Sequence, residues 1–458
     1  MDIRGEVDTA DFGDKRLSKR LVRLAEQIAK APDRSFPKAA GSDAALEATY
    51  RFLGNEAVTP EVVLVPHVRA TVSRCASAGA VVVAHDSSEF RFSSEREGLG
   101  RIAGDTTHGF LGHFALAVAA RDRAPLGVLG IETVFRERGG RTPRHRERRP
   151  MEDKESRRWV DLVRRADAEL GERVSAVHVM DREADGYELF AALASENRRF
   201  VVRLQFDRAT ETALGRGRIS DVLRGKRALL TRQVALSARS PQRRDPPSRA
   251  KKHPYRRERS ATLSVTACSV TILRPSHLGA RVPERLRLNV VRVREKNVGR
   301  GIDPVEWRLV TTEPVETAED VAAIVDAYRA RWVIEEFFRA LKQGCAYEKR
   351  QLESKHALLN ALAVFTPIAW QLLALRQLSR DDADLPADRV LSPLKLMLLQ
   401  RHPDVKLREE PTIRDAMFAV AKLGGHIKNN GEPGWQVLGR GYEDLLLLER
   451  GAALALRM

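Results

Sequence analysis

The sequence predicts an α/β fold with a mixed sheet core, an inserted antiparallel β subdomain and helical regions at both ends of the chain. Three observations lead to this fold class. Strand-like and helix-like stretches alternate between residues 80 and 204. Further β-branched runs follow within about 206–310, and helical periodicity dominates the two ends. A chain of 458 residues is long enough for two or three domains.

The sheet core is expected in residues 80–204, where β-branched apolar runs alternate with amphipathic stretches. The expected strands are 80–92, 109–120, 125–138, 176–180 and 199–204, and the expected helices are 154–170 and 185–197. Three strands, helix, strand, helix, strand is the order of a ribonuclease-H-like sheet. Helices that cross between strands make such a sheet mixed.

The segments around this core are less regular. Residues 1–60 form a basic amphipathic helical unit, suited either to DNA docking or to capping the core. Within the insertion, residues 240–260 are basic and rich in proline. We expect them to form either a DNA-contacting arm or a solvated loop. The last helix has an apolar face, for which core packing and dimerisation are both open.

The charge of the chain indicates a polyanionic partner. There are 79 Lys and Arg against 62 Asp and Glu, a net charge of +17, which fits nucleic acid or an anionic membrane surface. The longest apolar stretch, Ala357 to Leu375, contains Pro367 and polar residues. It predicts a buried, kinked core helix rather than a membrane span, so nucleic acid is the expected partner.

The cysteines and the N-terminus indicate a cytosolic protein. Cys75, Cys268 and Cys345 are far apart and form no C-x-x-C pair, which argues against a zinc cluster or a disulfide framework. Widely spaced cysteines are typical of a reducing compartment. The first residues are charged and lack the apolar segment of a signal peptide.

Two aspartates end strands of the predicted sheet. Asp86 follows the run VVVAH, and Asp181 follows AVHVM. Such carboxylates can converge at one sheet edge, and Mg²⁺ binds carboxylate oxygens while keeping several waters. The alternative is that each is a turn-forming residue at a strand end. Asp185 is expected to cap the next helix.

A third carboxylate is predicted on the helix that spans Val321 to Lys342. Tyr328, Arg331, Glu335 and Lys342 would fall within an arc of roughly 60° if each residue turns the helix by about 100°. Such a face could hold a metal on Glu335 and DNA phosphates on its cations. A solvated face with an Arg331–Glu335 ion pair is the alternative.

Taken together, these motifs resemble those of one enzyme family. The segments concerned are GDKRLSKRLVRLAEQIAK, ATYRFLGN, HDSSEF, DKESRRW, MDREADGYELF, RFVVR, WRLVTTEPVET, YRARWVIEEFFRALK and AKLGGHIKNNGEPGW. The chain resembles the DDE transposases of bacterial insertion sequences, in the IS-four group that carries a Tyr-Arg-Glu-Lys (YREK) signature. The similarity covers nearly the whole chain.

The resemblance assigns roles to ten residues. It implies that Asp86, Asp181 and Glu335 form a catalytic, metal-binding triad. The implied DNA-binding residues are Arg16, Arg20, Arg203, Trp307, Tyr328, Arg331 and Lys342. Among these, Arg16 and Arg20 would contact the transposon end, Arg203 would hold a terminal hairpin, and Trp307 would receive a flipped base. The alternative for Trp307 is a core residue of the β subdomain.

The resemblance also implies an activity and its requirements. The activity is cut-and-paste transposition by end binding, nicking, hairpin formation, hairpin opening and strand transfer. Mg²⁺ is the expected cofactor, with Mn²⁺ as a substitute and no nucleotide. The partners are double-stranded DNA, both transposon ends and target, and a second copy of the chain in a homodimer, with no membrane. The expected domains are 1–60 for end binding, 61–380 for catalysis with the insertion at about 206–310, and 381–458 for dimerisation. The location is bacterial cytoplasm, on the nucleoid when bound to DNA.

Two other functions remain open at this point. One is a ribonuclease-H-like nuclease that cuts nucleic acid without rejoining it. The other is a DNA-binding protein that derives from a transposase and has lost catalysis. Strand-transfer products distinguish the first from a transposase, and the complete acidic triad argues against the second.

Overall fold

The computed structural model of the chain divides into two compact units. The described residues are 3–30, 32–93, 96–102, 107–136, 154–236, 258–299, 302, 304–381, 384–389, 391–427 and 433–455. Unit 1 comprises Met1–Arg141, Asp161–Ala176 and Trp332–Met458. Unit 2 comprises Thr142–Val160 and Val177–Arg331. The strands and helices of each unit are described separately below.

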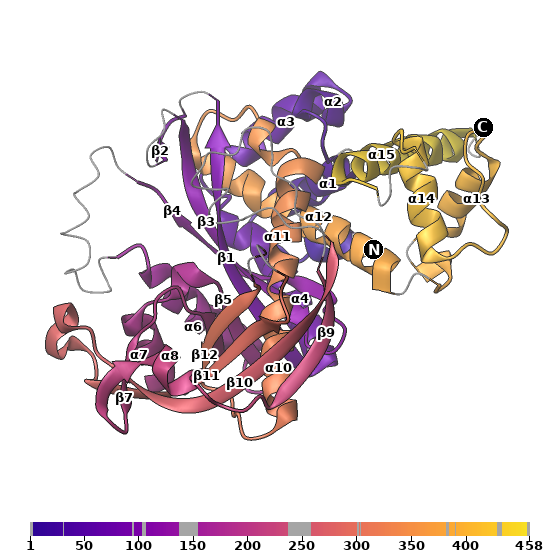
Figure 1. Ribbon diagram of the computed structural model, residues 1–458. Coiled ribbons are helices and arrows are strands. Elements are labelled where there is room, and N and C mark those ends of the chain that lie inside the picture. The colour runs from indigo at the N-terminus through magenta and orange to yellow at the C-terminus, as the bar shows by residue number, and fades with distance from the viewer. Residues whose placement is uncertain are drawn as a thin grey trace. The chain divides into compact units, whose positions relative to one another are not determined.

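An antiparallel sheet forms the centre of unit 1. Its strands are β1 (Ala80–Phe92), β2 (Gly100–Arg101), β3 (His108–Ala119) and β4 (Pro125–Val134). β3 lies between β1 and β4, and β2 pairs with its beginning (Figure 1). Because side chains alternate along a strand, even-numbered and odd-numbered residues of β1 point to opposite faces. The expected strands 80–92, 109–120 and 125–138 correspond to β1, β3 and β4. The two faces of β1 are covered by different elements.

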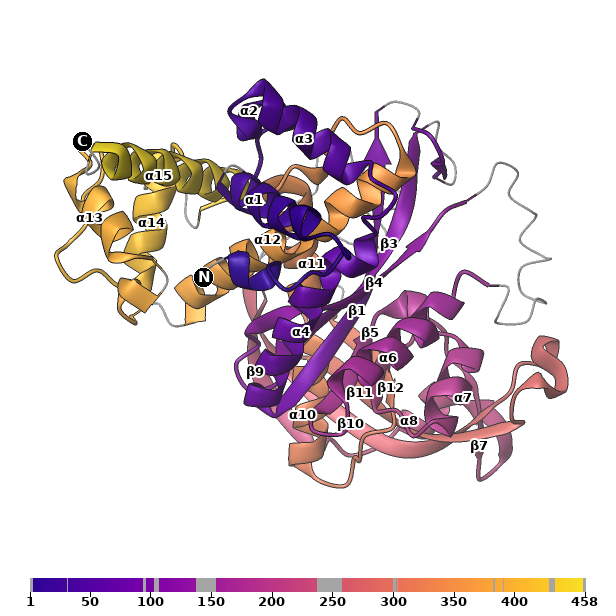
Figure 2. The same cartoon turned by 180° about the vertical axis from the view of Figure 1, so that it is seen from behind.

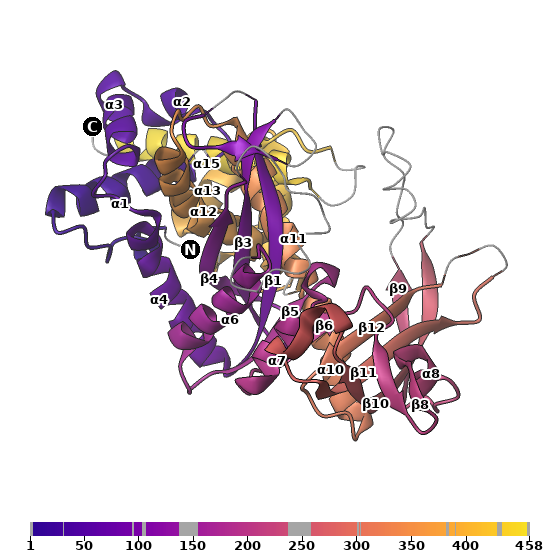
Figure 3. The same ribbon diagram turned by 90° about the vertical axis from the view of Figure 1, so that its left-hand side faces the viewer.

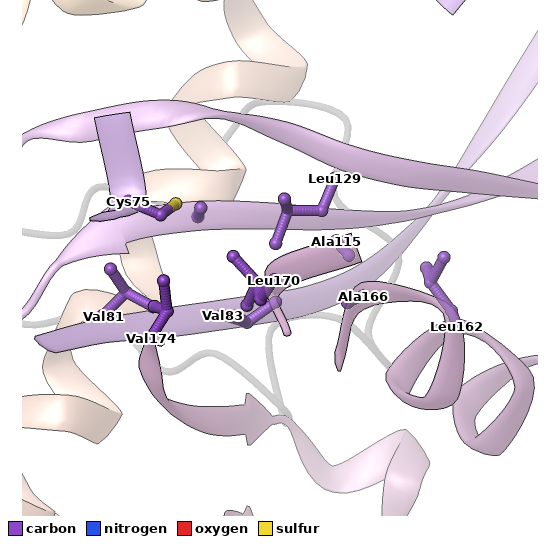
Figure 4. Close-up of a cluster of buried hydrophobic side chains, with 10 residues drawn as sticks. Cys75, Val81, Val83, Ala115, Leu129, Leu162, Ala166, Leu170 and Val174 are labelled. Atoms are coloured by element: carbon purple, nitrogen blue, oxygen red, sulfur yellow. The ribbon is translucent and has the colours of Figure 1, made fainter. Parts of the chain in front are cut away.

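The odd-numbered face of β1 packs into a hydrophobic core (Figure 4). Val81 and Val83 meet Leu162 and Leu170 of α6 (Arg157–Leu170), and Cys75 of α4 (Pro60–Ala78) joins them. All of these side chains are buried. Burying one leucine in this way contributes about 1.5–3 kcal/mol. This core fixes the strand that carries Asp86.

The N-terminal helices pack on a long apolar helix. They are α1 (Lys15–Lys30), α2 (Phe36–Ala40) and α3 (Asp43–Leu53), and they lie against α12 (Lys355–Asp381). Figure 2 shows α1 beside α12. α12 contains Pro367 and is long and apolar enough to cross a membrane, but 78% of its apolar window is buried inside the protein. The prediction of a core helix is thus confirmed.

Three helices group together at the C-terminal end of the chain (Figure 1). They are α13 (Pro393–Arg401), α14 (Ile413–Leu423) and α15 (Trp435–Ala455). Leu438 and Leu445 of α15 are buried against α14 and its neighbours. Leu447, in contrast, is 54% exposed. Much of the apolar face of the last helix therefore serves core packing, which was one of the two roles expected for it.

Unit 2 contains a mixed arrangement of strands. β5 (Ser175–Met180) runs parallel to β6 (Phe200–Arg203), and α7 (Tyr187–Ser195) connects them. Beyond β6 the strands pair antiparallel in the order β12 (Glu306–Thr311), β11 (Arg285–Lys296) and β10 (Arg259–Leu273), as Figure 3 shows. The remaining elements are β7 (Ala209–Thr212), β8 (Gly215–Arg218), α8 (Ile219–Leu223), β9 (Leu230–Leu236) and α10 (Ala318–Ala330).

Strands β9, β10 and β11 lie where the sequence predicted strands. The short strands β7 and β8 were not predicted, because they are polar and lack a β-branched run. β12 was not predicted as a strand either, yet it joins the long strands of the insertion to β6. Most of the basic stretch 240–260 lies outside the described residues.

A buried polar cluster attaches the N-terminus of unit 1 to its sheet. Glu6, in the turn η1 (Arg4–Glu6), lies 2.6 Å from His67 Nδ1 and accepts a hydrogen bond from Arg74 Nη1 at 2.7 Å. The Val128 N–H donates to His67 Nε2 at 3.0 Å. The ring therefore carries its proton on Nδ1 and is neutral, with Nδ1–H donating to Glu6.

The environment of this cluster shifts two pKa values downward. Burial lowers the pKa of His67 below its usual 6.5, although Glu6 opposes this. Burial acts to raise the pKa of Glu6, but hydrogen bonds from His67 and Arg74 outweigh it and lower that pKa. Each group therefore binds a proton less readily in the folded chain than in the unfolded one.

Acid should destabilise unit 1 through this cluster. His67 contributes stability that is complete above 6.5, the pKa of the unfolded residue, and that is lost as the pH falls below it. Each pH unit below that value should cost up to about 1.4 kcal/mol. Urea unfolding at about pH 7.5 and about pH 5.5 measures the effect. His67→Gln should reduce the difference between the two pH values by about 1 kcal/mol, and an unchanged difference would contradict this role.

Candidate active site

Asp86 points towards helix α11 (Trp332–Arg339). In the register of β1 and β3, Asp86 stands directly opposite Phe114. Residues directly opposite each other on antiparallel strands point to the same face of the sheet. The Phe114 ring packs against Phe337 at 5.5 Å and Phe338 at 5.4 Å between ring centroids. α11 therefore covers the even-numbered face of β1 at the level of Asp86.

Two adjacent glutamates of α11 have different surroundings. Glu336 is hydrogen-bonded to Arg339 and lies 3.5 Å from Arg376 of α12. Glu335 lies three residues before Phe338, so the two share one side of α11. Because Phe338 contacts Phe114, Glu335 flanks the side of α11 that packs on β3. Glu335 and Asp86 are both half-buried residues of unit 1.

Lys342 is anchored to the same face of β1. It lies in a π-helical turn, Ala340–Gly344, where its Nζ donates to the Glu89 carbonyl at 2.5 Å. Nζ is 5.1 Å from the centre of the Phe90 ring and 3.6 Å from Glu348 Oε1. Burial lowers the pKa of Lys342, although Glu348 opposes this. A largely buried ammonium held by fixed partners is placed to attract an anion.

The helix expected from Val321 to Lys342 is present as two consecutive α-helices and a π-helical turn. α10 ends at Ala330, Arg331 is a one-residue break with helical backbone angles, and the π-helical turn follows α11. A rotation of about 100° per residue does not hold in the π-helical turn. Tyr328 and Arg331, which is 8% exposed, belong to unit 2, whereas Glu335 and Lys342 belong to unit 1. Within unit 1, Lys342 lies in the π-helical turn and so does not continue the α-helical spacing of Glu335.

In unit 2, Asp181 lies within a group of arginines. Its Oδ1 accepts a hydrogen bond from the Glu183 N–H at 2.8 Å and so caps the turn η3 (Arg182–Ala184). Burial and the charges of Arg203 and Arg308 lower the pKa of Arg182, whereas Tyr328 and Asp181 raise it. The side chain of Arg182 thus interacts electrostatically with each of the other four. Asp181, Arg203 and Tyr328 were predicted from the sequence as site residues.

Arg182 and Arg308 were missed as members of this group. Arg182 is exposed, and its charge interacts with that of Asp181, the residue before it. The only signal for it was its place directly after Asp181. Arg308 follows Trp307 on β12 and lies 3.1 Å from Asp207. Both add positive charge beside a carboxylate that was predicted to bind metal and DNA.

Trp307 and Tyr328 form a pair of aromatic rings. Their centroids are 5.5 Å apart and their planes are tilted by 58°. Tyr328 is only 6% exposed, whereas Trp307 is half-buried. Arg203 stands opposite Leu309, two residues from Trp307, and so shares its face of the strands. Arg203, Trp307 and Tyr328 are therefore gathered on one side of unit 2.

The expectation that Asp185 caps α7 is wrong. The residue before α7 is Gly186, and no side chain caps this helix. Asp185 instead accepts hydrogen bonds from the Gln205 and Phe206 N–H groups at 2.6 and 2.8 Å, and from Arg208 Nε at 2.6 Å. This buried carboxylate holds the segment that follows β6. It therefore fixes the backbone just beyond Arg203.

Arg16 and Arg20 lie on α1, away from these contacts in the sequence. Asp14 caps the helix by accepting a hydrogen bond from the Arg16 N–H at 2.8 Å. The Arg16 side chain is 91% exposed and pairs with Asp14 at 3.0 Å. Arg20 is half-exposed, while Leu21, Leu24 and Ile28 face the interior. α1 thus combines a buried apolar side with a basic outer surface.

The candidate metal ligands are divided between the units. Asp86 and Glu335 belong to unit 1, and Asp181 belongs to unit 2. Within either unit, the described residues include no group of three His, Cys, Asp or Glu side chains placed to hold a metal ion. Carboxylate oxygens are the hard donors that Mg²⁺ prefers.

Two family models match the chain. The model described as transposase DNA-binding matches residues 3–58, and the model described as transposase DDE domain matches residues 78–365. The chain belongs to the DDE transposases. The first match covers Arg16 and Arg20 of this transposase. The second begins just before β1, ends within α12 and includes all the candidate carboxylates. DNA is therefore a partner of the transposase, and the expected enzyme class is confirmed.

Replacing Phe114, which contacts α11, should reduce the free energy of unfolding only modestly but should clearly slow DNA cleavage. Phe114→Leu should lower the free energy of unfolding by about 1 kcal/mol and slow cleavage about tenfold, because α11 would shift relative to Asp86. The matched control is Phe92→Leu. The Phe92 ring contacts Phe110 and Tyr347 and does not contact α11 in the described interactions. Equal cleavage rates for the two variants, measured on a DNA with the element's own ends, would contradict the positioning role.

Proposed function

We propose that the transposase carries out cut-and-paste transposition of an insertion sequence, with Asp86, Asp181 and Glu335 as its metal-binding triad. The observation that carries this proposal is the packing of α11 on β3: Asp86 pairs with Phe114, Phe114 contacts Phe338, and Glu335 lies one helical turn before Phe338. The sequence resemblance to the IS-four group with a YREK signature, and within it to the transposase of transposon Tn-five, supports the same assignment.

The carboxylates suit Mg²⁺, or Mn²⁺ in its place. Asp86 and Glu335 would hold the metal from unit 1, and Asp181 from unit 2, so catalysis would require the units to bring these groups together. The metal would polarise the scissile phosphate and lower the pKa of the attacking water or 3′-hydroxyl. Lys342 and Arg182, both with pKa values lowered by burial, would hold DNA phosphates beside the carboxylates.

Unit 2 provides a group suited to a DNA hairpin intermediate. A half-buried indole with a cation nearby can stack on a flipped base and hold its phosphate. Trp307 would receive the base, and Arg203 would hold the hairpin. Because Tyr328 is buried against Trp307, its role would be to support the indole. Arg331, which is also buried, would position the start of α11. The proposed steps are nicking, hairpin formation, hairpin opening and strand transfer.

The remaining parts of the chain would organise the DNA. Arg16 and Arg20 on α1 would bind the transposon end within a domain of residues 1–60. Residues 61–380 would form the catalytic domain with its insertion at about 206–310, and residues 381–458 would contribute to a homodimer that holds two ends. The setting would be the bacterial cytoplasm, on the nucleoid.

The triad is tested by comparing adjacent glutamates. Glu335→Gln, Asp86→Asn and Asp181→Asn should each reduce cleavage of end DNA by at least about a thousandfold, because each removes a metal ligand. Glu336→Gln is the matched control, since Glu336 is bound to Arg339 and Arg376. It should lower stability slightly and leave cleavage within about threefold of wild type.

The gel assay also separates the alternatives. With Mg²⁺ and a target plasmid, the wild-type protein should yield strand-transfer products as well as cut ends. Cut ends without joined products would indicate a nuclease. Cleavage by any triad variant at a near wild-type rate would show that the assignment is wrong.

End binding by α1 is tested through its salt dependence. Arg20→Gln should weaken binding to end DNA and reduce the slope of log affinity against log salt by about 1, as expected for loss of one phosphate contact. Arg16→Gln should behave alike, and in addition it frees Asp14. Fluorescence anisotropy between about 50 and about 200 mM salt measures the slope. An unchanged slope in both variants would show that α1 does not contact the phosphates of the end DNA.

A further inference from the structure

A polar cavity of about 430 Å³ opens on unit 2 beside strands β10 and β11. The register pairs Ser264 with Arg294 and Thr266 with Arg292, so these side chains share one face. Lys296 lies two residues beyond Arg294 on the same face and completes the charged lining. Trp307 pairs with Val293, and it therefore points to the opposite face. The cavity is thus distinct from the aromatic pair described above.

The lining of this cavity carries an excess of positive charge. Arg292, Arg294 and Lys296 alternate along β11, about 7 Å from one to the next. The acidic residue of the lining is Glu295, whose carboxylate is held by Arg259 at 2.9 and 2.8 Å and by the Val305 N–H at 3.0 Å. Glu306, which stands opposite Arg294 on β12, is exposed. The three cations therefore exceed the acidic charge around them.

Two polar atoms of the lining are buried without a hydrogen-bond partner in the described part of the chain. They are Thr266 Oγ1 and Arg292 Nε. Thr266 is only 4% exposed, and it stands directly opposite Arg292 on the same face of the strands. Buried polar groups in folded proteins are nearly always hydrogen-bonded. A hydroxyl and a guanidinium side by side in a basic cavity are donors suited to a phosphate oxygen.

The same row of side chains leads back to the candidate active site. Arg308 of β12 stands opposite Arg292 and therefore lies on the cavity's face of the strands. Arg308 also belongs to the electrostatic group around Arg182 and Asp181. Adjacent strands are about 4.8 Å apart. Arg308 thus adds a further cation on the cavity's face of β12.

We propose that this cavity binds a phosphate group of the DNA backbone and forms a further DNA contact of the transposase. The proposal rests on the proposed function in so far as DNA is the substrate, and it is independent of the triad. Arg292 would contact the phosphate together with Thr266, and Arg294 and Lys296 would bind neighbouring phosphates of the same strand. Free inorganic phosphate offers the same chemistry and is the other source to be tested.

The experiment measures DNA binding without metal, so failure of the triad assignment cannot affect the result. Arg292→Gln should weaken binding of an end-DNA duplex about five- to tenfold and reduce the salt slope by about 1. Thr266→Val should weaken it about threefold, because it loses one hydrogen bond to a charged group. Arg287→Gln is the matched control, an exposed arginine of β11 that points away from the cavity. It should change affinity by less than about twofold.

Inorganic phosphate distinguishes the source of the ligand. Titration calorimetry with phosphate alone should show at most weak binding to the wild-type protein. Tight phosphate binding that Arg292→Gln abolishes, with DNA affinity unchanged, would overturn the DNA assignment in favour of a free-phosphate site. If Arg292→Gln and Thr266→Val alter neither DNA nor phosphate binding while circular dichroism shows that both are folded, the cavity does not bind phosphate.

Discussion

The packing of α11 against β1 and β3 is the constraint on which the candidate site depends. Phe114 contacts Phe337 and Phe338 on one side of the sheet, and on the opposite side β1 is fixed by the core with α6. A strand held from both faces cannot rotate its side chains out of register. Asp86 and Glu335 are consequently carried by elements held in place by close-packed apolar groups, which deform little.

The two units contribute different chemical groups to the proposed reaction. Unit 1 supplies two carboxylates and the anchored ammonium of Lys342. Unit 2 supplies Asp181 among arginines, together with the indole of Trp307. Carboxylates are the ligands that a divalent metal prefers, and arginines and lysines are the groups that bind DNA phosphates.

Residues 80–204 were predictable because strand and helix periods are strong there, and the two aspartates follow directly from strand ends. The turn at Arg331 was not predictable, since the sequence keeps an apolar helical period through it. The role of Asp185 was predicted wrongly, because its position before a helix is typical of a helix cap. The N–H groups that it binds belong to Gln205 and Phe206, about 20 residues further along the chain. The electrostatic partners of Arg182 and Arg308 required tertiary structure, because an isolated arginine in a basic chain carries no signal of its neighbours.

The most direct test of convergence is a distance measurement between the units. Asp86→Cys and Asp181→Cys are combined in one chain, and the protein is treated with a short bifunctional thiol reagent in the presence of end DNA. Mass spectrometry then identifies the linked peptides. We expect a link between positions 86 and 181 that depends on DNA and is absent from each single variant. Efficient labelling of both cysteines without any link would contradict a shared metal site.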